Sequence, residues 1–208
     1  MIIKTLAVGP YETNCYIVAS DVTKRGLVID PGAEPKNILD LIDELGLKIS
    51  WIIITHSHFD HVGALNPVKE ATGALIAIHE SEGDSKLQAA AQVFGGIMAG
   101  SIHKPTKADR LLKDGDYVEI DDLNFEVLYT PGHSPGGICL LTNGILFSGD
   151  TLFNMGIGRT DFPGSSHNKL MESIRNRLMT LPDQTVVYPG HGPATTIGDE
   201  RKSNPFFE

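Results

Sequence analysis

Cysteine is scarce in this chain: Cys15 and Cys139 are the only two among 208 residues. Each lies in a strand-like stretch, so we expect small buried thiols in a reducing compartment, although spacing alone leaves a disulfide open. No apolar run is long enough to cross a bilayer. Residues 1–6 also lack the charged head, apolar middle and cleavage site of a signal peptide. The sequence therefore predicts a cytoplasmic protein with no membrane partner.

Basic residues are outnumbered: 17 Lys and Arg face 26 Asp and Glu, which gives a formal net charge of −9. Nucleic-acid surfaces need clustered cations to neutralise phosphates, so no nucleic-acid partner is expected. The overall composition, 41% hydrophobic and 21% charged, is that of an ordinary globular protein. A chain of this length can bury a substantial core. No stretch has the composition of a linker, and we expect one domain over residues 1–208.

The most distinctive stretch is Thr-His-Ser-His-Phe-Asp-His-Val-Gly at residues 55–63. It follows a run of one tryptophan and three isoleucines, which predicts a buried strand. In an extended segment residues two apart point the same way, so His56 and His58 can approach one ion. A helical turn after them would aim Asp60 and His61 at a neighbouring point. Imidazole and carboxylate ligands suit zinc, iron or manganese.

A single histidine at a strand end is more often a solvated or capping residue than a metal ligand. Packing does not explain four ligand-type side chains within six positions, directly after a buried strand. The sequence therefore predicts a metal site in which one short loop contributes to two adjacent metal positions.

Apolar periodicity predicts strands and helices along most of the chain. Strands are expected at residues 2–8, 13–19, 26–30, 51–54, 74–78, 117–120, 125–129, 137–141, 145–148 and 185–188. Helices are expected at residues 34–45, 64–72 and 168–181, with a short closing helix after residue 196. Two halves of strands followed by helices favour two sheets packed face to face with helices outside. This is an α/β fold of the four-layer αβ/βα sandwich type.

Some polar residues allow a structural and a functional interpretation. Asp30, before a Pro-Gly turn, is either an ordinary turn carboxylate or a partner that holds a metal-binding histidine ring. Residues 80–108 are the part whose structure is hardest to predict from the sequence. Within them, 87–93 is compatible with a helix, and the glycines that follow fit either a cover over a pocket or a plain connector. His79 and His103 lack ligand-type neighbours, so we expect structural roles for both.

Three more ligand-type residues each follow a predicted strand: His133, Asp150 and His191. In each case a neighbouring glycine lets the backbone turn sharply and leaves the polar side chain exposed at the edge of the sheet. Ligand pockets in layered α/β folds gather where strand ends meet. A lone Gly-His pair is weak evidence because turns accept both residues, but three such strand ends strengthen the prediction of a metal centre.

Residues 55–61 together with His133, Asp150 and His191 resemble the five-part signature of the metallo-β-lactamase superfamily. The spacing and flanking residues are most similar to the glyoxalase II group, and the similarity covers nearly the whole chain. The signature is specific for fold and metal binding and unspecific for substrate. Glyoxalase II enzymes run longer, with a C-terminal helical domain that grips glutathione, so this chain resembles a short form without that domain.

The resemblance implies two divalent metal ions per chain, with zinc first and iron or manganese as alternatives. The implied ligands are His56, His58 and His133 for one ion, Asp60, His61 and His191 for the other, and Asp150 bridging both. Asp60 and Asp150 would act in catalysis as ligands that position a metal-bridging hydroxide, which attacks a thioester carbonyl. Asp at position 150, where some true β-lactamases of this fold carry Cys, argues against β-lactamase activity.

Substrate contacts are expected in the stretch 153–162, which is similar to short bacterial glyoxalase II-like hydrolases and to persulfide dioxygenases. Phe153 and Arg159 are the candidates. Arg159 would either bind a substrate carboxylate or form an ion pair with Asp161 that orders the loop.

Three functions are compatible with the resemblance. The leading one is a hydroxyacylglutathione hydrolase-like enzyme that hydrolyses a small-molecule thioester such as S-lactoylglutathione. The second is a mononuclear iron persulfide dioxygenase, which would leave His61 and His191 unligated. The third is a non-catalytic metal-binding module, which would not need a complete dinuclear ligand set. RNA processing, also known in the superfamily, is disfavoured by the acidic charge.

Overall fold

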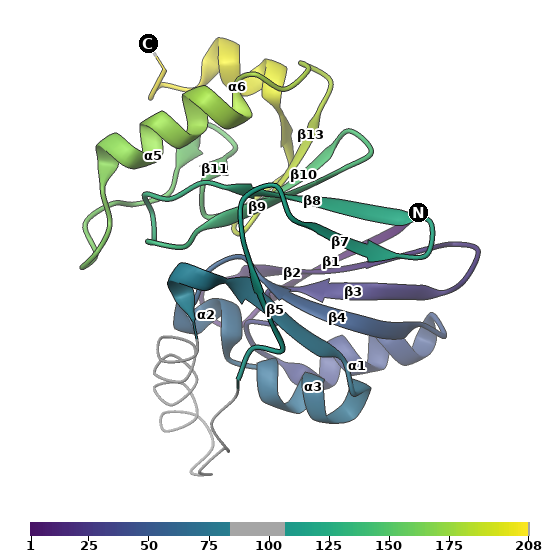
Figure 1. The fold of residues 1–208 in the computed structure, drawn as a ribbon. Helices are drawn as coiled ribbons and strands as arrows, with labels where there is room; N and C mark the ends of the chain where they lie inside the picture. The colour runs from purple at the N-terminus through teal and green to yellow at the C-terminus, as the bar shows by residue number, and fades with distance from the viewer. Residues whose placement is uncertain (84–106, 208) are drawn as a thin grey trace. The chain divides into compact units, whose positions relative to one another are not determined.

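The computed structural model describes residues 1–83 and 107–207. The chain forms two compact units, each built on one six-stranded sheet (Figure 1). The first unit consists of Met1–Leu112 and Glu119–Asn124, and the second of Lys113–Val118 and Phe125–Glu208. The single domain expected over the whole chain stays a prediction. The expected helix at 87–93 and His103 lie outside the described residues, as does most of the segment 80–108.

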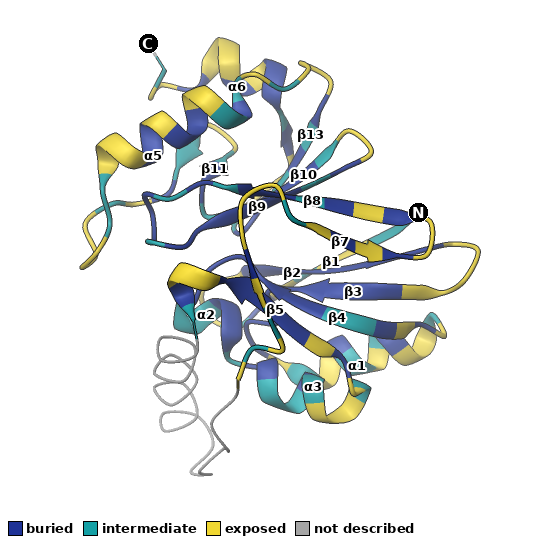
Figure 2. Ribbon diagram, viewed as in Figure 1, coloured by how far each residue is buried: buried dark blue, intermediate teal, exposed yellow. Residues whose placement is uncertain are grey.

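The sheet of the first unit has six strands in chain order. They are β1 (Ile2–Val8), β2 (Thr13–Ala19), β3 (Arg25–Ile29), β4 (Lys48–Ile54), β5 (Leu75–His79) and β6 (Arg110–Leu112). Strands β1, β2 and β3 pair antiparallel, whereas β3 to β6 pair parallel. Figure 2 shows β2 and β3 buried along most of their lengths. Because β3, β4 and β5 are parallel neighbours, their carboxyl ends lie at one edge of the sheet.

Within the described part of the first unit, three α-helices accompany this sheet: α1 (Pro35–Glu44), α2 (Phe59–Val62) and α3 (Leu65–Thr72). The apolar residues of α1 and α3 recur at helical spacing and join the strands in one core. The buried contributors from these two helices are Ile38, Ile42, Leu65 and Val68. Gly46, with a positive φ of 63°, follows α1 and ends it.

The second sheet has the strand order β14-β13-β10-β9-β8-β7, and all of it except Glu119–Asn124 belongs to the second unit. Its strands are β7 (Tyr117–Ile120), β8 (Leu123–Tyr129), β9 (Ile138–Thr142), β10 (Ile145–Gly149), β13 (Val186–Pro189) and β14 (Thr195–Thr196). Strands β10 and β13 pair parallel, and β8–β9, β9–β10 and β13–β14 pair antiparallel. A separate hairpin is formed by β11 (Leu152–Phe153) and β12 (Gly156–Ile157).

Helices α5 (His167–Ser173) and α6 (Ile197–Ser203) and a π-helix, η2 (Ile174–Leu178), pack on the second sheet. Their buried side chains share an apolar core with the strands, through Leu170, Ile174, Leu178 and Ile197. The amphipathic stripe expected over 168–181 is therefore present, but its helix is α-helical only at the start.

Most expected elements occur near their predicted bounds, and the differences have physical reasons. Strand β4 begins earlier than its apolar run, at Lys48, because its first residues alternate exposed and buried. Strands β6, β11, β12 and β14 have no counterpart in the sequence prediction, since two or three residues are too few for periodicity to register.

Both cysteines are free and buried, Cys15 on β2 and Cys139 on β9. Burial raises the pKa of the Cys15 thiol far above its ordinary value, and the nearby charge of Asp30 adds to the rise. Burial also raises the pKa of Cys139 to about 11. Such thiols are inert, so neither is a candidate nucleophile. Among the helices of the described residues, none has the length and apolarity needed to cross a membrane.

Candidate metal centre

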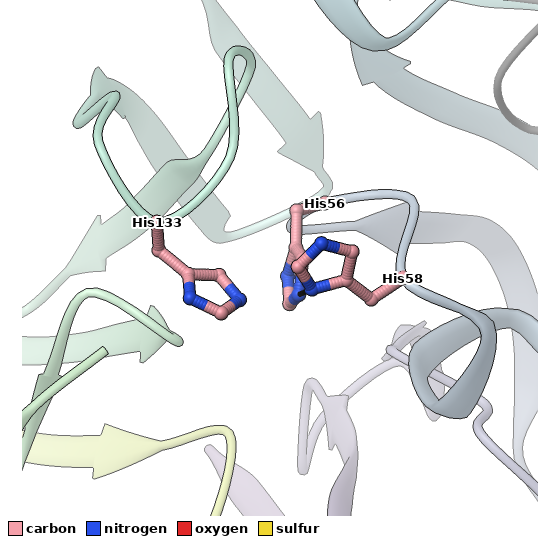
Figure 3. A group of neighbouring side chains, drawn as sticks. All are labelled: His56, His58 and His133. Atoms are coloured by element: carbon pink, nitrogen blue, oxygen red, sulfur yellow. Dashed lines mark hydrogen bonds between the residues drawn. The ribbon is translucent and has the colours of Figure 1, made fainter. Parts of the chain in front are cut away.

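The first group of predicted ligands follows β4, at the edge where β3, β4 and β5 end: His56, His58, Asp60 and His61. The rings of His56 and His58 meet edge to face, with centroids 4.5 Å apart. Nε2 of His56 lies 3.0 Å from Nδ1 of His58, the contact drawn as a dashed line in Figure 3. Two imidazole nitrogens from residues two apart therefore face each other, as two ligands of one ion would.

Helix α2 carries Asp60 and His61 in its single turn. Nε2 of His61 lies 3.6 Å from Oδ2 of Asp60, and the His61 ring centroid is 4.1 Å from that of His56. The same oxygen of Asp60 accepts a hydrogen bond of 3.1 Å from the hydroxyl of Thr13 on β2. Gly32 permits this packing, because a Cβ there would lie 1.8 Å from the carbonyl oxygen of Asp60.

Asp30, which is 1% exposed, anchors this loop from the end of β3. Its carboxylate accepts hydrogen bonds from the backbone N–H of Thr55 at 2.8 Å, the hydroxyl of Thr55 at 2.6 Å and Nδ1 of His61 at 2.9 Å. Oγ1 of Thr55 lies 3.2 Å from Nδ1 of His56 and accepts from it. With Nδ1 of both histidines acting as donor, Nε2 carries the lone pair that a metal requires. Asp30 is therefore the partner of a histidine ring, the functional one of its two interpretations.

The second group consists of His133, Asp150 and His191, which follow β8, β10 and β13 of the second sheet. Oδ2 of Asp150 lies 3.4 Å from Nε2 of His133 and 3.6 Å from Nε2 of His191. One carboxylate oxygen thus lies near two imidazoles. A carboxylate has two oxygens and can serve two ions, so this arrangement suits a shared ligand.

His133, also drawn in Figure 3, is held by main-chain atoms. Its Nδ1 donates to the carbonyl of Arg159 at 2.8 Å, and its own carbonyl accepts from the hydroxyl of Ser165 at 2.7 Å. Gly158 packs against both neighbouring ligands: a Cβ there would lie 1.9 Å from the carbonyl oxygen of Asp150 and 3.0 Å from Cβ of His133. The segment at 158–159 therefore fixes two ligands at once.

The two predicted substrate contacts lie beside ligands of this second group. Phe153 on β11 meets His191 edge to face, with ring centroids 6.2 Å apart. Arg159 forms a bidentate ion pair with Asp161, at 2.7 Å from Nε and 2.6 Å from Nη2, and its guanidinium lies 4.3 Å from the ring centroid of Phe162. The hydrogen bond from Arg159 lowers the pKa of Asp161 to about 2. Both side chains of the pair are exposed, at 63% and 65%.

The donor set of both groups consists of imidazole nitrogens and carboxylate oxygens, which zinc, iron and manganese all accept. The Nδ1 contacts of His56, His61 and His133 are typical of histidines that bind a metal through Nε2. The residues present therefore fit divalent metal ions of the kind that the sequence predicts.

Of three further contacts in and around the two ligand groups, the sequence predicts the role of one and does not indicate the other two. His79 caps the 3₁₀ helix η1 (Glu80–Glu82), where its Nδ1 accepts from the backbone N–H of Ser81 at 3.2 Å, in the expected structural role. Nothing in the sequence indicates Thr13 or the Arg159 carbonyl as partners of ligands. Thr13 lies far from Asp60 in the chain, and a main-chain carbonyl leaves no trace in residue type.

The family model of the metallo-β-lactamase superfamily matches residues 8–191, a range that includes both ligand groups. The chain belongs to this superfamily. The probable metallo-hydrolase YqgX of Bacillus subtilis is 39% identical, over 98% of this chain and 96% of its own length. The hydroxyacylglutathione hydrolase GloC of Haemophilus influenzae is 37% identical, over 100% and 98%.

Several solved structures also match the chain along nearly its whole length. The B3 metallo-β-lactamase BLEG-1 gives a TM-score of 0.90 at 36% identity and covers 99% of each chain. The di-iron-bound form of TTHA1623 gives 0.84 at 38%, over 98% of this chain and 99% of its own. ETHE1 from Myxococcus xanthus gives 0.84 at 32%, over 99% and 84%. The predicted resemblance and the predicted fold class, an α/β sandwich of the metallo-β-lactamase type, are confirmed.

Proposed function

We propose that this superfamily member is a metal-dependent hydrolase of small-molecule thioesters, with S-lactoylglutathione as the representative substrate. The observation that carries the proposal is the donor set, in which His56, His61 and His133 are each anchored through Nδ1. Anchored imidazoles are oriented for a metal before it binds. Metals in such sites activate water for hydrolysis.

Neither ligand group alone completes two ligand sets. The first supplies the His56–His58 pair and the Asp60–His61 turn, and the second supplies one carboxylate near two histidines. We infer that one histidine of the second group completes each set and that Asp150 is shared. The resulting sets are His56, His58 and His133, and Asp60, His61 and His191. On this account both units belong to one domain over residues 1–208.

Two divalent ions held by these ligands would supply a water of lowered pKa and positive charge for hydrolysis of the thioester. Asp60 and Asp150 contribute by holding negative charge at fixed points, Asp60 through its hydrogen bond from Thr13. A serine or cysteine nucleophile is not required. The hydroxyl of Ser57 donates a hydrogen bond to the carboxylate of Glu82, and both cysteines are buried.

Arg159 and Phe153 are the proposed substrate contacts. Each lies beside a proposed ligand, since Phe153 packs on His191 and the Arg159 carbonyl accepts from His133. The guanidinium of Arg159 offers the two parallel N–H donors that a carboxylate prefers. Its partner Asp161 is exposed, so exchange for a substrate carboxylate costs little. A thioester of glutathione, which carries carboxylates on its thiol portion, suits such a contact.

Thioester hydrolysis is preferred because GloC, named a hydroxyacylglutathione hydrolase, is 37% identical and similar in length. Zinc is the first metal proposed, and the di-iron-bound form of TTHA1623 supports iron as the alternative. An iron persulfide dioxygenase is the competing activity, and it would leave His61 and His191 unligated. The proposed partners are small molecules only, and the free thiols support the cytoplasm as the proposed compartment.

The test begins with protein purified without added metal, whose zinc, iron and manganese are measured by inductively coupled plasma mass spectrometry. The same protein is assayed for S-lactoylglutathione hydrolysis, for oxygen uptake with glutathione persulfide and for hydrolysis of a β-lactam. We expect two divalent ions per chain and thioester hydrolysis that a chelator abolishes and added metal restores.

One iron per chain with oxygen uptake would replace the hydrolase by the dioxygenase. Turnover of the β-lactam in preference to the thioester would replace it by the activity for which BLEG-1 is named. Stoichiometric metal without turnover of any substrate would leave a metal-binding module and overturn the enzymatic proposal.

A further inference from the structure

A buried glutamate lies beside the first ligand group and has no role in the mechanism above. Glu82, 2% exposed, belongs to η1 directly after β5. Its Oε2 accepts a hydrogen bond from the hydroxyl of Ser57, which is itself 8% exposed. Ser57 lies between the proposed ligands His56 and His58. A buried carboxylate is costly to desolvate, so its location against this loop calls for an explanation.

The order of the parallel strands explains how Glu82 reaches the loop. Strand β4 lies between β3 and β5, and all three end at the same edge. Asp30 at the end of β3 holds Thr55, and Glu82 beyond the end of β5 holds Ser57. Two buried carboxylates, one after each neighbouring strand, therefore hold the segment after β4 by hydrogen bonds.

The order of residues in this loop decides what the two carboxylates hold. Thr55 and Ser57 are two residues apart, and so are His56 and His58, so the anchored residues alternate with the proposed ligands along the chain. Holding Thr55 and Ser57 fixes the peptide units on both sides of His56 and on the near side of His58. The separation of 3.0 Å between the ring nitrogens of the two histidines depends on those peptide units.

We propose that Glu82 is a positioning residue that acts through Ser57 to orient the His56–His58 pair for metal binding. The inference rests on the proposed function, because it takes this pair as ligands. It predicts that the Ser57–Glu82 hydrogen bond tunes metal affinity and does more than stabilise the fold. Outer contacts of this kind typically change metal affinity by about 10–100-fold.

The variants Ser57→Ala, Glu82→Ala, Glu82→Gln and the Ser57→Ala/Glu82→Ala double variant test this. The matched control is Thr195→Ala, which removes a hydroxyl that donates to the buried carboxylate of Glu200 at 2.6 Å, outside the proposed ligand sets. Zinc affinity is measured by competition with a chromophoric chelator, and thermal unfolding is recorded for each variant. Glu82 has further interactions, so Ser57→Ala removes less than Glu82→Ala does. If Glu82→Ala does not fold, the zinc affinity of Ser57→Ala decides whether the proposed positioning role holds.

We expect Ser57→Ala and Glu82→Ala each to weaken zinc binding by about 10-fold or more, and the double variant to equal the singles because both remove one contact. Glu82→Gln should lose less, since Gln keeps an acceptor oxygen without the charge. Thr195→Ala should unfold at lower temperature with unchanged zinc affinity. Wild-type affinity in Ser57→Ala, or an equal loss in Thr195→Ala, overturns the proposal. Failure of the wild-type protein to bind zinc would instead overturn the proposed function.

Discussion

The two ligand groups are built in opposite ways. The first group lies within six consecutive positions after one strand, and a buried side chain, Asp30, anchors two of its histidines directly or through Thr55. The second group comes from three separate strand ends, and the main-chain carbonyl of Arg159 anchors His133. A contiguous group depends on local conformation and nearby carboxylates, whereas a dispersed group depends on sheet order and backbone packing.

Both groups share one packing feature, a glycine that lies against the main-chain carbonyl of a ligand aspartate. Gly32 packs against the carbonyl of Asp60, and Gly158 packs against the carbonyl of Asp150. In each unit a missing side chain lets a second segment of backbone contact a ligand aspartate. The units therefore differ in how they hold histidines and agree in how they hold aspartates.

The largest expected effect comes from removing one ligand of either group. His58→Ala and Asp150→Ala should each lose metal and lower kcat/KM for S-lactoylglutathione by at least about 10³-fold, or ~4 kcal/mol of transition-state stabilisation. Equal losses from the contiguous and the dispersed group would mean that both serve one reaction. Metal content by mass spectrometry and steady-state kinetics measure the effect. His167→Ala, a histidine outside both groups, is the control, and full metal with full turnover in either ligand variant would refute the assignment.

Asp30→Asn tests the side-chain anchor of the first group. An amide group cannot accept from all three donors that Asp30 serves, and its N–H would face Nδ1–H of His61. The other tautomer of His61 would then be favoured, with the proton on Nε2. We expect zinc affinity to fall by about 10–100-fold and the protein to lose about 2 kcal/mol of stability.

The measurements for Asp30→Asn are chelator competition and urea denaturation. ¹⁵N spectra of the histidine rings report the tautomer directly. An unchanged His61 tautomer with unchanged zinc affinity would contradict the role assigned to Asp30.

The contrast between the groups also decides how far the sequence could predict the site. The loop after β4 was recognisable because its ligand-type residues are adjacent and follow an apolar strand. His133, Asp150 and His191 were recognisable only as a set, through three strand ends that share the same glycine-flanked form. In both cases side-chain type carried the information.

Most of the contacts that hold the ligands could not be predicted from the sequence. Thr13, Glu82 and the carbonyl of Arg159 lie far in sequence from the residues that they contact, and each is an ordinary residue in its own segment. Asp30 could be identified as a candidate, but its role could not be assigned, because a turn position and a partner of a histidine ring both favour aspartate. The short strands and the π-helix were missed since they are set by pairing and packing rather than by local periodicity.

Gly158→Ala tests the backbone device in the second unit, with Gly32→Ala as its counterpart in the first. The added Cβ would lie 1.9 Å from the Asp150 carbonyl in one case and 1.8 Å from the Asp60 carbonyl in the other. Each should cost about 2 kcal/mol or more from overpacking and shift a ligand aspartate. Gly156→Ala is the control, because its Cβ would meet nothing closer than 3.7 Å. Thermal unfolding and zinc titration of the three variants distinguish the outcomes, and wild-type behaviour of Gly158→Ala would contradict the packing.

The smallest expected effect concerns the exposed ion pair beside the second group. Asp161→Asn removes the carboxylate that occupies Arg159, so KM for S-lactoylglutathione should fall by roughly two- to fivefold, the scale of an exposed ion pair. Arg159→Gln should raise the same KM. A thioester of N-acetylcysteamine, which lacks a carboxylate, should respond to neither change. Opposite shifts for the two variants distinguish substrate binding from simple ordering of the loop, which both variants would impair alike.

The titration of Asp161 gives an independent measure of the same pair. Its pKa is lowered from 3.8 to about 2, so the pair is intact above about pH 4 and its contribution is lost as the pH falls towards 2. In Arg159→Gln the pKa should return towards 3.8, which carbon-detected NMR can follow. Because Asp161 is fully ionised at neutral pH, the effect of Asp161→Asn on KM should be constant between pH 6 and 8. A KM shift that varies over that range would assign the effect to another group and remove Asp161 from competition for Arg159.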